Sequence, residues 1–408
     1  MLRQVEGSRA VAETVARCRP DVVAAYPISP QTHIVEALSD LVAEGRAGRC
    51  EFLMVESEFG AMSACIGASA AGGRAYTATA SQGLLFMAEA LPNASGLRLP
   101  VVMTVANRAL GAPINIWNDH SDAMSQRDAG WIQLFASSNQ EAVDLHVQAF
   151  VVAESLHVPV MVNMDGFVLT HAMEGIDVPD QDEVDALLPP FRPLHVLDPD
   201  HPVTIGAMVG PEAFTEVKYL EARRQLRSLD AIQEVADRFH RVTGRRSGGL
   251  TSSYRLEDAD VVLIGLGSLL GTAADVVDEL RDEGLAVGLL GVTCFRPWPL
   301  DEIRDSLADA SRVVVLNRAL SVGFGTVLGA DVRLTLAGSQ VVVHDVVAGL
   351  GGRPVTRDLV RRLLVEAVRG ELSDHQLTFA DLDVDLAERE LLGELVGPMD
   401  VEPEGVGR

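Results

Sequence analysis

Five polar residues in the N-terminal part of the sequence follow short apolar runs, and their types could support chemistry. Ser29 comes shortly after the run VVAAYP, Glu58 after FLMVE and Arg108 after PVVMTVAN. Ser81 and Gln82 follow the run AYTATA and precede a glycine. Hydroxyl, amide, carboxylate and guanidinium groups hold polar ligands or exchange protons. If these side chains meet in one place, they indicate a binding or catalytic site.

The segments that carry these residues alternate between strand-like and helical patterns. Several of the strand-like runs are continuous in Val, Ala and Met, which is typical of strands covered on both faces. They lie at 22–27, 52–56, 75–80, 100–107, 131–137 and 159–165. Helical patterns lie between them, at 31–45, 58–73, 84–96 and 139–156. The alternation predicts a doubly wound parallel sheet, in which ligands bind outside the carboxyl ends of the strands.

Each candidate residue also has a structural interpretation. Ser29 and Ser81 could be N-caps of the helices that follow them. Glu58 could be a first-turn carboxylate stabilised by the helix dipole, and Arg108 could pair with a surface acid. Their common place at one sheet edge favours a site. The helix that starts at Glu58 is rich in small residues, which predicts close packing at an interface.

A second α/β pattern follows a region rich in Pro and Asp. Residues 176–215 are predicted to form a long linker, followed by a helix at about 212–243 and a loop at 244–249. The second pattern has strands at 260–267, 285–295, 311–318 and 340–349, and helices at 272–284, 300–310 and 356–370, the last capped by Thr356. We therefore predict an α/β protein with two doubly wound parallel-sheet domains, 1–245 and 256–370, and an acidic tail at 371–408.

Composition excludes several classes of protein. The chain has 408 residues with 58 acidic and 33 basic side chains, a net charge of −25. Such a balance disfavours a nucleic-acid or anionic-membrane surface. No apolar run reaches the roughly 18 residues of a membrane span, and the N-terminus lacks a signal-peptide pattern, so we expect a cytoplasmic protein. Lys218 is the only lysine and has no glycine loop before it, which excludes a standard P-loop.

Cysteine and histidine spacing predicts no metal site in this chain. The four cysteines, Cys18, Cys50, Cys65 and Cys294, form no C-x-x-C pair, so neither a zinc ribbon nor a ferredoxin-type cluster is encoded. We expect reduced, buried thiols. The segment at 119–122, Asp-His-Ser-Asp, has the residue types of a metal site, but a loop with structural or solvated side chains is the favoured interpretation.

Several long motifs resemble one enzyme family. The segments YPISPQTHIVE, VESEFGAMSACIGASAAGGRAYTATASQGL, ANRALGAPINIWNDHSDAMSQRDAGWIQ and MDGFVLTH are similar to the α subunit of thiamine-dependent 2-oxoacid:ferredoxin oxidoreductases, especially the pyruvate enzyme. The resemblance continues through GLTSSYRLEDADVVLIGLGS, FRPWP and VAGLGGRPVT, over about residues 1–370. It implies a pyrimidine-binding thiamine domain followed by a transketolase C-terminal-like domain.

The resemblance also implies residue roles. Glu58 matches the glutamate that hydrogen-bonds the aminopyrimidine ring of thiamine diphosphate and promotes the tautomer that removes the thiazolium proton. Ser81 and Gln82 are implied to bind the cofactor. Arg108 matches the arginine that binds the substrate carboxylate. Ser29 stands where the family usually has threonine, so a hydroxyl is kept, but the pocket gains the space of a methyl group.

The same resemblance implies partner chains. The thiamine diphosphate pattern Gly-Asp-Gly, followed after about thirty residues by Asn, is absent, since Met164-Asp165-Gly166 does not match it. The resemblance therefore implies a β subunit that holds the diphosphate and Mg²⁺, a ferredoxin-like subunit with 4Fe–4S clusters and a γ subunit. The implied reaction is oxidative decarboxylation of a 2-oxoacid with coenzyme A, to acyl-CoA and CO₂, with electrons passed to ferredoxin. Pyruvate is the expected substrate, and the alternative is the same chemistry on another 2-oxoacid, such as an aryl glyoxylate, with a different acceptor.

Two further function classes stay open on the sequence. The turn from Gly265 to Gly271 follows a strand and opens a helix, as in nicotinamide-dependent dehydrogenases. Its spacing is G-x-G-x-x-x-G, and the next strand ends without the acid that would bind the ribose. A tight turn in a non-catalytic domain is therefore favoured. A non-enzymatic assembly protein would be indicated if Glu58 and Arg108 could be replaced without effect on a reconstituted complex.

Overall fold

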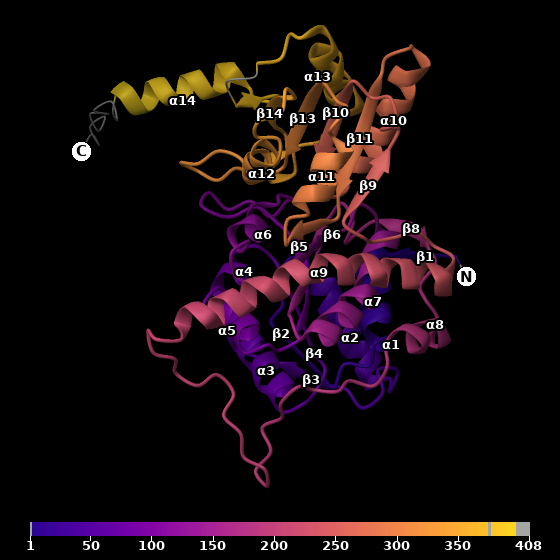
Figure 1. Ribbon diagram of the computed structural model, residues 1–408, viewed down its shortest axis with the longest axis vertical. Coiled ribbons are helices and arrows are strands. Elements are labelled where there is room, and N and C mark those ends of the chain that lie inside the picture. Colours follow the sequence, from indigo (N-terminus) through magenta and orange to yellow (C-terminus); the bar gives the residue numbers. More distant parts are fainter. Residues whose placement is uncertain (1, 374–376, 397–408) are drawn as a thin grey trace, which may run out of the picture.

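Two parallel β-sheets, each covered by helices, organise the molecule (Figure 1). The protein is represented by a computed structural model that describes residues 2–373 and 377–396. This confirms the predicted α/β class with parallel-sheet domains, while the domain boundaries at 245 and 256 remain predictions. None of the described helices has the length and apolar content needed to cross a membrane.

The first sheet holds seven strands in the order β12-β6-β7-β5-β4-β2-β3. All neighbours except the pair β12 and β6 run parallel. The six parallel strands are β2 (Val22–Ala25), β3 (Glu51–Met54), β4 (Ala75–Thr79), β5 (Val102–Asn107), β6 (Ile132–Phe135) and β7 (Val160–Asp165). Every residue of the central strands β4, β5 and β7 is buried, which explains their continuous apolar sequence.

Helices cover both faces of the first sheet and form two apolar cores. One core is formed with α1 (Gly7–Arg17), α2 (Thr32–Ala43) and α7 (Asn139–Leu156). The other is formed with α3 (Glu58–Ala70), α4 (Ser81–Phe86) and α5 (Ala90–Gly96). The long helix α9 (Phe214–Thr243) packs on α7, so α7 is buried along most of its length. The sheet is therefore doubly wound, as predicted.

The second sheet has the order β15-β14-β13-β10-β11-β9, with only β9 antiparallel. Its strands are β9 (Thr251–Tyr254), β10 (Val261–Gly265), β11 (Val287–Val292), β13 (Arg312–Asn317), β14 (Val342–Val347) and β15 (Thr378–Phe379). One face packs on α10 (Leu269–Asp282) and α13 (Arg357–Arg369), the other on α11 (Leu300–Ser306) and α12 (Val327–Thr335). Thr356 caps α13, because its Oγ1 accepts a hydrogen bond from Leu359 N at 3.2 Å, as predicted.

The two sheets are joined by a strand that the sequence did not separate. The predicted strand 285–295 is wrong as a single element: β11 stays in the second sheet, whereas β12 (Cys294–Arg296) pairs antiparallel with β6 at the edge of the first. Phe295 packs edge-on against Phe135, with 5.8 Å between ring centroids. The chain leaves one sheet for the other at Thr293, so both sheets share a packed junction.

Two other predicted segments differ from the structure. The linker 176–215 contains α8 (Gln181–Leu187), which starts with a reciprocal capping box between Asp180 and Glu183. The helix predicted at 84–96 is two helices, α4 and α5. Pro92 lies in the first turn of α5, where a missing N–H costs little, so the helix starts anew just before it.

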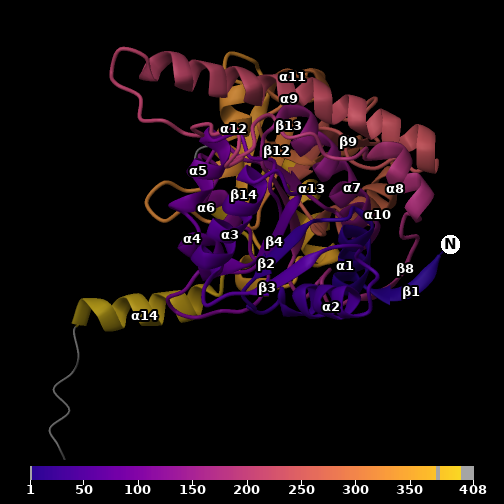
Figure 2. The same ribbon diagram turned by 90° about the horizontal axis from the view of Figure 1, so that it is seen from below.

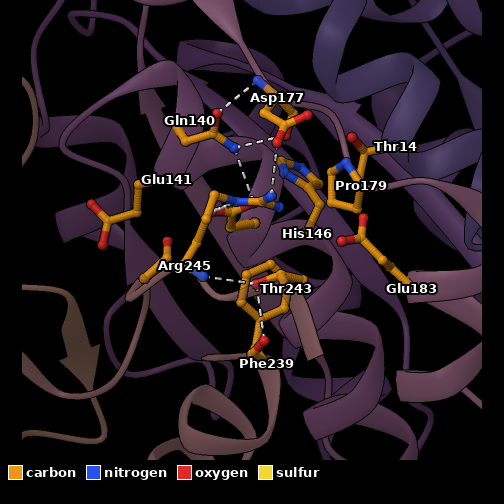
Figure 3. A network of polar contacts seen from close by, with 12 residues as sticks. Thr14, Gln140, Glu141, His146, Asp177, Pro179, Glu183, Phe239, Thr243 and Arg245 are labelled. Atoms are coloured by element: carbon orange, nitrogen blue, oxygen red, sulfur yellow. Dashed lines mark hydrogen bonds and ion pairs between the residues drawn. The ribbon is translucent and has the colours of Figure 1, made fainter. Parts of the chain in front are cut away.

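A polar network around Arg245 fixes the loop at 244–249 (Figure 3). Arg245 Nη2 donates to Asp144 Oδ1 of α7 at 2.8 Å, and Nη1 lies 3.4 Å from Asp177 Oδ2. Gln140 of α7 exchanges two hydrogen bonds with the Asp177 backbone, at 2.8 and 3.0 Å. The network ties the end of α9 to α7 and to the segment after β8 (Met173–Ile176), which pairs with β1 (Arg3–Glu6).

The acidic tail includes a helix, α14 (Val384–Val396), which projects away from the body of the molecule in both views (Figures 1 and 2). The apolar periodicity of LAERELLGEL in this tail predicts either a short helix or an extended arm on a partner, and the structure has a helix there. Residues 374–376 and 397–408 of the predicted tail lie outside the described part of the chain.

Candidate active site

Glu58 is the first residue of α3 and lies almost buried, at 8% exposure. The preceding Ser57 caps the helix, since its Oγ accepts a hydrogen bond from Gly60 N at 3.1 Å. No described residue donates a hydrogen bond to the Glu58 carboxyl group. A Cβ atom at Gly83 would lie 2.6 Å from Glu58 Oε1 and 2.5 Å from Thr79 Oγ1. A glycine is therefore needed to seat this carboxyl group at the end of β4.

Ser81 and Gln82 are the first two residues of α4, which follows β4 directly after Ala80. Ser81 is fully buried with φ +48°, and its hydroxyl donates to Ala109 O at 2.5 Å. The N-cap of α4 is Ala80, so the capping interpretation of Ser81 is wrong. Gln82 faces the segment after β5, because its Nε2 lies 2.7 Å from where a Cβ at Gly111 would be. A non-glycine residue in the left-handed region indicates a turn held by its surroundings.

Arg108 and Ser29 lie in contact at the ends of β5 and of the β2 segment. Arg108 is 6% exposed, and its Nη1 donates to Ser29 O at 2.8 Å. None of the described carboxylates forms an ion pair with this guanidinium, so the surface-acid interpretation is wrong. Burial lowers the pKa of Arg108, while the nearby Asp122 carboxylate opposes the shift. Ser29 is exposed, and Gln31 rather than Ser29 is the N-cap of α2.

Asp122, on the short helix α6 (Ser121–Ser125), connects these turns from beneath. Its fully buried carboxylate accepts hydrogen bonds from Ser81 N, Arg108 N and Asn107 Nδ2, each at 3.0 Å. Burial raises the pKa of Asp122, and these donors oppose the rise. The structural interpretation of the segment 119–122 is confirmed for Asp122. Sequence reasoning missed that Asp122 sets the relative position of two candidate site residues.

The second sheet contributes a turn that supports the loop after Arg108. Asn115 Nδ2 donates to Gly351 O at 3.1 Å, and Gly351 N donates to Asp119 Oδ2 at 3.2 Å. These glycines belong to the 3₁₀ turn η1 (Leu350–Gly352). A cavity of about 430 Å³ lies between the loop at 109–112 and residues 319–322, which follow β13 of the second sheet. The glycine run VAGLGG was the only sequence signal for this contact.

A side chain of the first sheet, Asp165, occupies the carboxyl edge of the second sheet. Asp165, at the end of β7, accepts from Arg318 Nη1 at 2.7 Å and from Ser268 N at 2.9 Å, and its other oxygen lies 2.7 Å from His120 Nε2. Burial alone would raise the pKa of Asp165, but Arg318 and His120 hold it well below its usual range. A Cβ at Gly267 would lie 2.8 Å from Asp165 Oδ1. Asp165 thus fills the turn where a dinucleotide phosphate would bind, which contradicts the dehydrogenase alternative.

The cysteines are free and buried, as predicted. Burial raises the pKa of the Cys18 and Cys65 thiols to about 12, so these side chains stay protonated near neutral pH. No group of three potential metal ligands among the described residues includes a cysteine.

Comparison with known proteins identifies the family. Residues 13–237 match a family described as pyruvate flavodoxin/ferredoxin oxidoreductase, thiamine diphosphate-binding, and residues 259–360 match pyruvate:ferredoxin oxidoreductase core domain II. Fold and matched regions define a subunit of a thiamine diphosphate-binding oxidoreductase. The chain belongs to the 2-oxoacid:ferredoxin oxidoreductase family and corresponds to its α subunit.

Several relatives are similar over most of their length. Pyruvate synthase subunit PorA of Methanosarcina barkeri is 48% identical over 89% of this chain and 91% of the relative, and PorA of Thermotoga maritima is 43% identical over 90% and 95%. Ketoisovalerate oxidoreductase subunit VorA of Pyrococcus horikoshii is 40% identical over 86% and 90%. A solved 2-oxoglutarate:ferredoxin oxidoreductase from Magnetococcus marinus, with 2-oxoglutarate, coenzyme A and succinyl-CoA bound, has a TM-score of 0.71 at 19% identity. That match covers 90% of this chain and 65% of the solved chain, and it supports the fold.

Proposed function

We propose that this chain is the α subunit of an enzyme that oxidatively decarboxylates pyruvate with coenzyme A to an acyl-CoA and CO₂, and passes the electrons to ferredoxin. One observation carries the proposal. The carboxyl group of Glu58 is buried without a hydrogen-bond donor and lies against Gly83 of α4, and the Asp122 carboxylate joins the start of α4 to Arg108, whose buried guanidinium forms no ion pair. The names of the PorA relatives support pyruvate, and VorA supports a branched 2-oxoacid as the second candidate.

Glu58 and its surroundings fit the aminopyrimidine half of thiamine diphosphate. When bound, the cofactor supplies a nucleophilic carbon that attacks a 2-oxo group. Gly83 leaves the space beside Glu58 free of a side chain, and the buried hydroxyl of Thr79 has no hydrogen-bond partner in the described structure. We assign to Glu58 the holding of a proton at a ring nitrogen, a role that needs a carboxyl group. Ser81 and Gln82 then fix the turn that borders this space.

Arg108 suits the substrate carboxylate. Ser29 O and Asn115 O orient the guanidinium through Nη1 and Nε, whereas Nη2 has no hydrogen bond to any described residue. A buried cation is destabilising until an anion pairs with it, so substrate binding would relieve this cost. Because the backbone oxygen of Ser29 contacts the guanidinium, we assign to the Ser29 hydroxyl the role of a second donor for the oxoacid.

Partner chains complete the proposed enzyme. Asp165 is committed to Arg318 and is therefore a poor magnesium ligand. We propose that a β subunit binds the diphosphate and Mg²⁺ and covers this edge, and that ferredoxin-like and γ subunits complete a cytoplasmic complex carrying 4Fe–4S clusters. Exposed apolar side chains on the site's own elements support such a cover: Phe86 at 57%, Trp117 at 53% and Ile114 at 78% exposure. The acidic tail with α14 is a further candidate arm for a partner.

Calorimetry and reconstitution test the assembly. The isolated chain is expected to fold without binding thiamine diphosphate tightly, because it lacks the diphosphate and magnesium ligands. The reconstituted complex is expected to bind it and to reduce ferredoxin with pyruvate and coenzyme A. Micromolar, magnesium-dependent binding by the isolated chain would contradict the shared site. A reconstituted complex that bound the cofactor but did not turn over any 2-oxoacid would contradict the proposed reaction.

A further inference from the structure

Two histidines and a glutamate from distant parts of the chain lie close together near the start of α2. Glu6 Oε1 lies 2.6 Å from His33 Nδ1, and the imidazole rings of His33 and His171 have centroids 4.4 Å apart. One ligand atom from each of the three side chains lies within 4.8 Å of the other two. No other group of three His, Cys, Asp or Glu side chains in the described residues meets this condition.

The backbone explains why the three side chains meet. Glu6 ends β1 and is paired in register with Met173, the first residue of β8. His171 lies two residues before Met173, and His33 lies in the first turn of α2, which packs on α1 directly after Glu6. The three ligands therefore sit on three elements that the fold holds together. None of the sequence spacings hinted at this group.

The surroundings of His171 match those of a metal ligand. Its Nδ1 lies 2.7 Å from Thr170 Oγ1, which leaves Nε2 free for a ligand. Thr170 is fully buried and also accepts from Phe167 N at 2.8 Å, so it fixes the ring through a second contact.

Ligand type and spacing select the class of ion. Two imidazole nitrogens and one carboxylate oxygen suit Zn²⁺ and similar transition metals, whereas Mg²⁺ and Ca²⁺ prefer oxygen ligands. Ligands around tetrahedral Zn²⁺ stand roughly 3.3 Å apart at bond lengths of about 2.0–2.1 Å. Glu6 Oε1 and His33 Nδ1 are closer than that, at 2.6 Å, and all three ligand atoms lie within 4.8 Å of one another, so side-chain rotation would have to set the final spacing. His33 and Glu6 remain 47% and 27% exposed at their side chains, which leaves the ion a path from solvent.

We propose that Glu6, His33 and His171 bind one divalent transition-metal ion, best matched by Zn²⁺, with water in the fourth position. The ion would clamp the start of α2 to the ribbon formed by β1 and β8. Because α2 begins just after the turn that carries Ser29, the clamp would brace the substrate side of the sheet edge. The site does not depend on the proposed enzyme activity and can be measured on the chain alone.

A competition titration tests the site. The full chain without a polyhistidine tag, stripped by a chelator, is titrated with Zn²⁺ in the presence of a chromophoric chelator. The wild type is expected to take up one equivalent, and Zn²⁺ should raise its melting temperature. His171→Ala should weaken binding by about 100-fold or more, above the effect of most residues that only support a ligand. His33→Ala should do the same, and because His33 is exposed, this variant keeps the test valid if His171→Ala folds poorly.

The matched control is His201→Ala. His201 also pairs with a carboxylate, Asp198, at 3.3 Å, but it belongs to no group of three ligands among the described residues. This variant should bind Zn²⁺ as the wild type does. With Co²⁺, the wild type should show visible absorption without the near-ultraviolet band of a thiolate ligand. Absence of a Zn²⁺ equivalent, an equal loss in His201→Ala, or a thiolate band would each overturn the proposal.

Discussion

Buried charged side chains at the carboxyl ends of the strands differ between two regions: they are paired at the closed edge, where the two sheets meet, and unpaired at the open edge, which carries Glu58 and Arg108. At the closed edge, Asp165, which ends β7 of the first sheet, contacts Arg318, His120 and the start of α10. At the open edge, Glu58 and Arg108 are nearly as buried, yet neither side chain forms an ion pair with a described residue. Since a buried, unpaired charge is costly, the open edge is suited to bind a charged ligand, whereas the closed edge holds the two sheets together.

Asp122 explains how the open edge stays in shape without a ligand. Backbone N–H groups of Ser81 and Arg108 share this one carboxylate, so their turns are held independently of the side chains above them. A preorganised site loses less free energy when the ligand binds, because its groups are already ordered. Both edges are thus held by hydrogen bonds within the chain. They differ because the charged side chains are paired at the closed edge and unpaired at the open edge.

The largest expected effect comes from opening the closed edge. Asp165→Asn leaves the Arg318 guanidinium, 6% exposed, without its carboxylate. Removing one partner of such a buried pair costs about 3–5 kcal/mol of the free energy of unfolding. Urea unfolding measures the loss, with Asp198→Asn as the control, since it breaks an exposed pair worth roughly 0–1 kcal/mol. Equal losses in both variants would show that the junction is not stabilised by Asp165.

The same variant has a pH signature. Because the folded-state pKa of Asp165 lies below its usual value, its stabilising effect is present above about pH 3.9 and is lost as the pH falls below that value. The difference in the free energy of unfolding between wild type and Asp165→Asn should therefore be constant near neutral pH and shrink at acid pH. A difference that grew on acidification would contradict the sign of the shift.

At the open edge, Arg108→Ala should impair substrate use without harming the fold. Loss of a charge-assisted pair in a closed site costs roughly 2–5 kcal/mol, a fall of about 30- to 5,000-fold in kcat/KM. The fall should affect every 2-oxoacid, while thiamine diphosphate affinity and the free energy of unfolding stay close to wild type. Steady-state kinetics of the reconstituted complex test this against Arg46→Ala, which removes an exposed arginine. Weaker cofactor binding in Arg108→Ala would assign the guanidinium to the cofactor instead.

Glu58→Gln tests the carboxyl group at the same edge. An amide of equal size cannot hold the proton, so turnover of the reconstituted complex should fall on the order of a hundredfold or more. The melting temperature should not fall, because no hydrogen bond within the chain is lost. Glu56→Gln is the matched control, two residues earlier and exposed. If Glu58→Gln keeps near wild-type turnover and Glu56→Gln does not, the role belongs to Glu56.

The sequence was sufficient to predict the open edge, because parallel strands end at one side of a sheet. Ser29, Glu58, Ser81 and Arg108 follow such strands, whose apolar runs are visible in the sequence. The sequence did not predict which residues pair with the buried polar groups, because tertiary packing determines these partners. Asp165 and Arg318 lie 153 residues apart, and no periodicity links them.

The same limit explains the other misses. The run through β11 and β12 is continuously apolar, so its split between two sheets leaves no local trace. Glu6, His33 and His171 meet only because β1 pairs with β8. By contrast, the break between α4 and α5 was predictable from Pro92, because proline is tolerated in the first turn of a helix but not in its interior.

The smallest expected effect is a change in substrate preference when Ser29, at the open edge, is replaced. The backbone oxygen of this serine accepts a hydrogen bond from Arg108. We propose that the methyl group it lacks, relative to the threonine usual in the family, leaves room for the substrate side chain. Ser29→Thr should therefore favour pyruvate over a bulky aryl oxoacid, since the added methyl group occupies that room. One apolar group changes such a ratio by roughly 10- to 200-fold at most. The measurement is the ratio of kcat/KM for pyruvate and phenylglyoxylate in both forms of the reconstituted complex. An unchanged ratio would move the specificity determinant to the exposed Ile114 and Trp117 or to the partner chain.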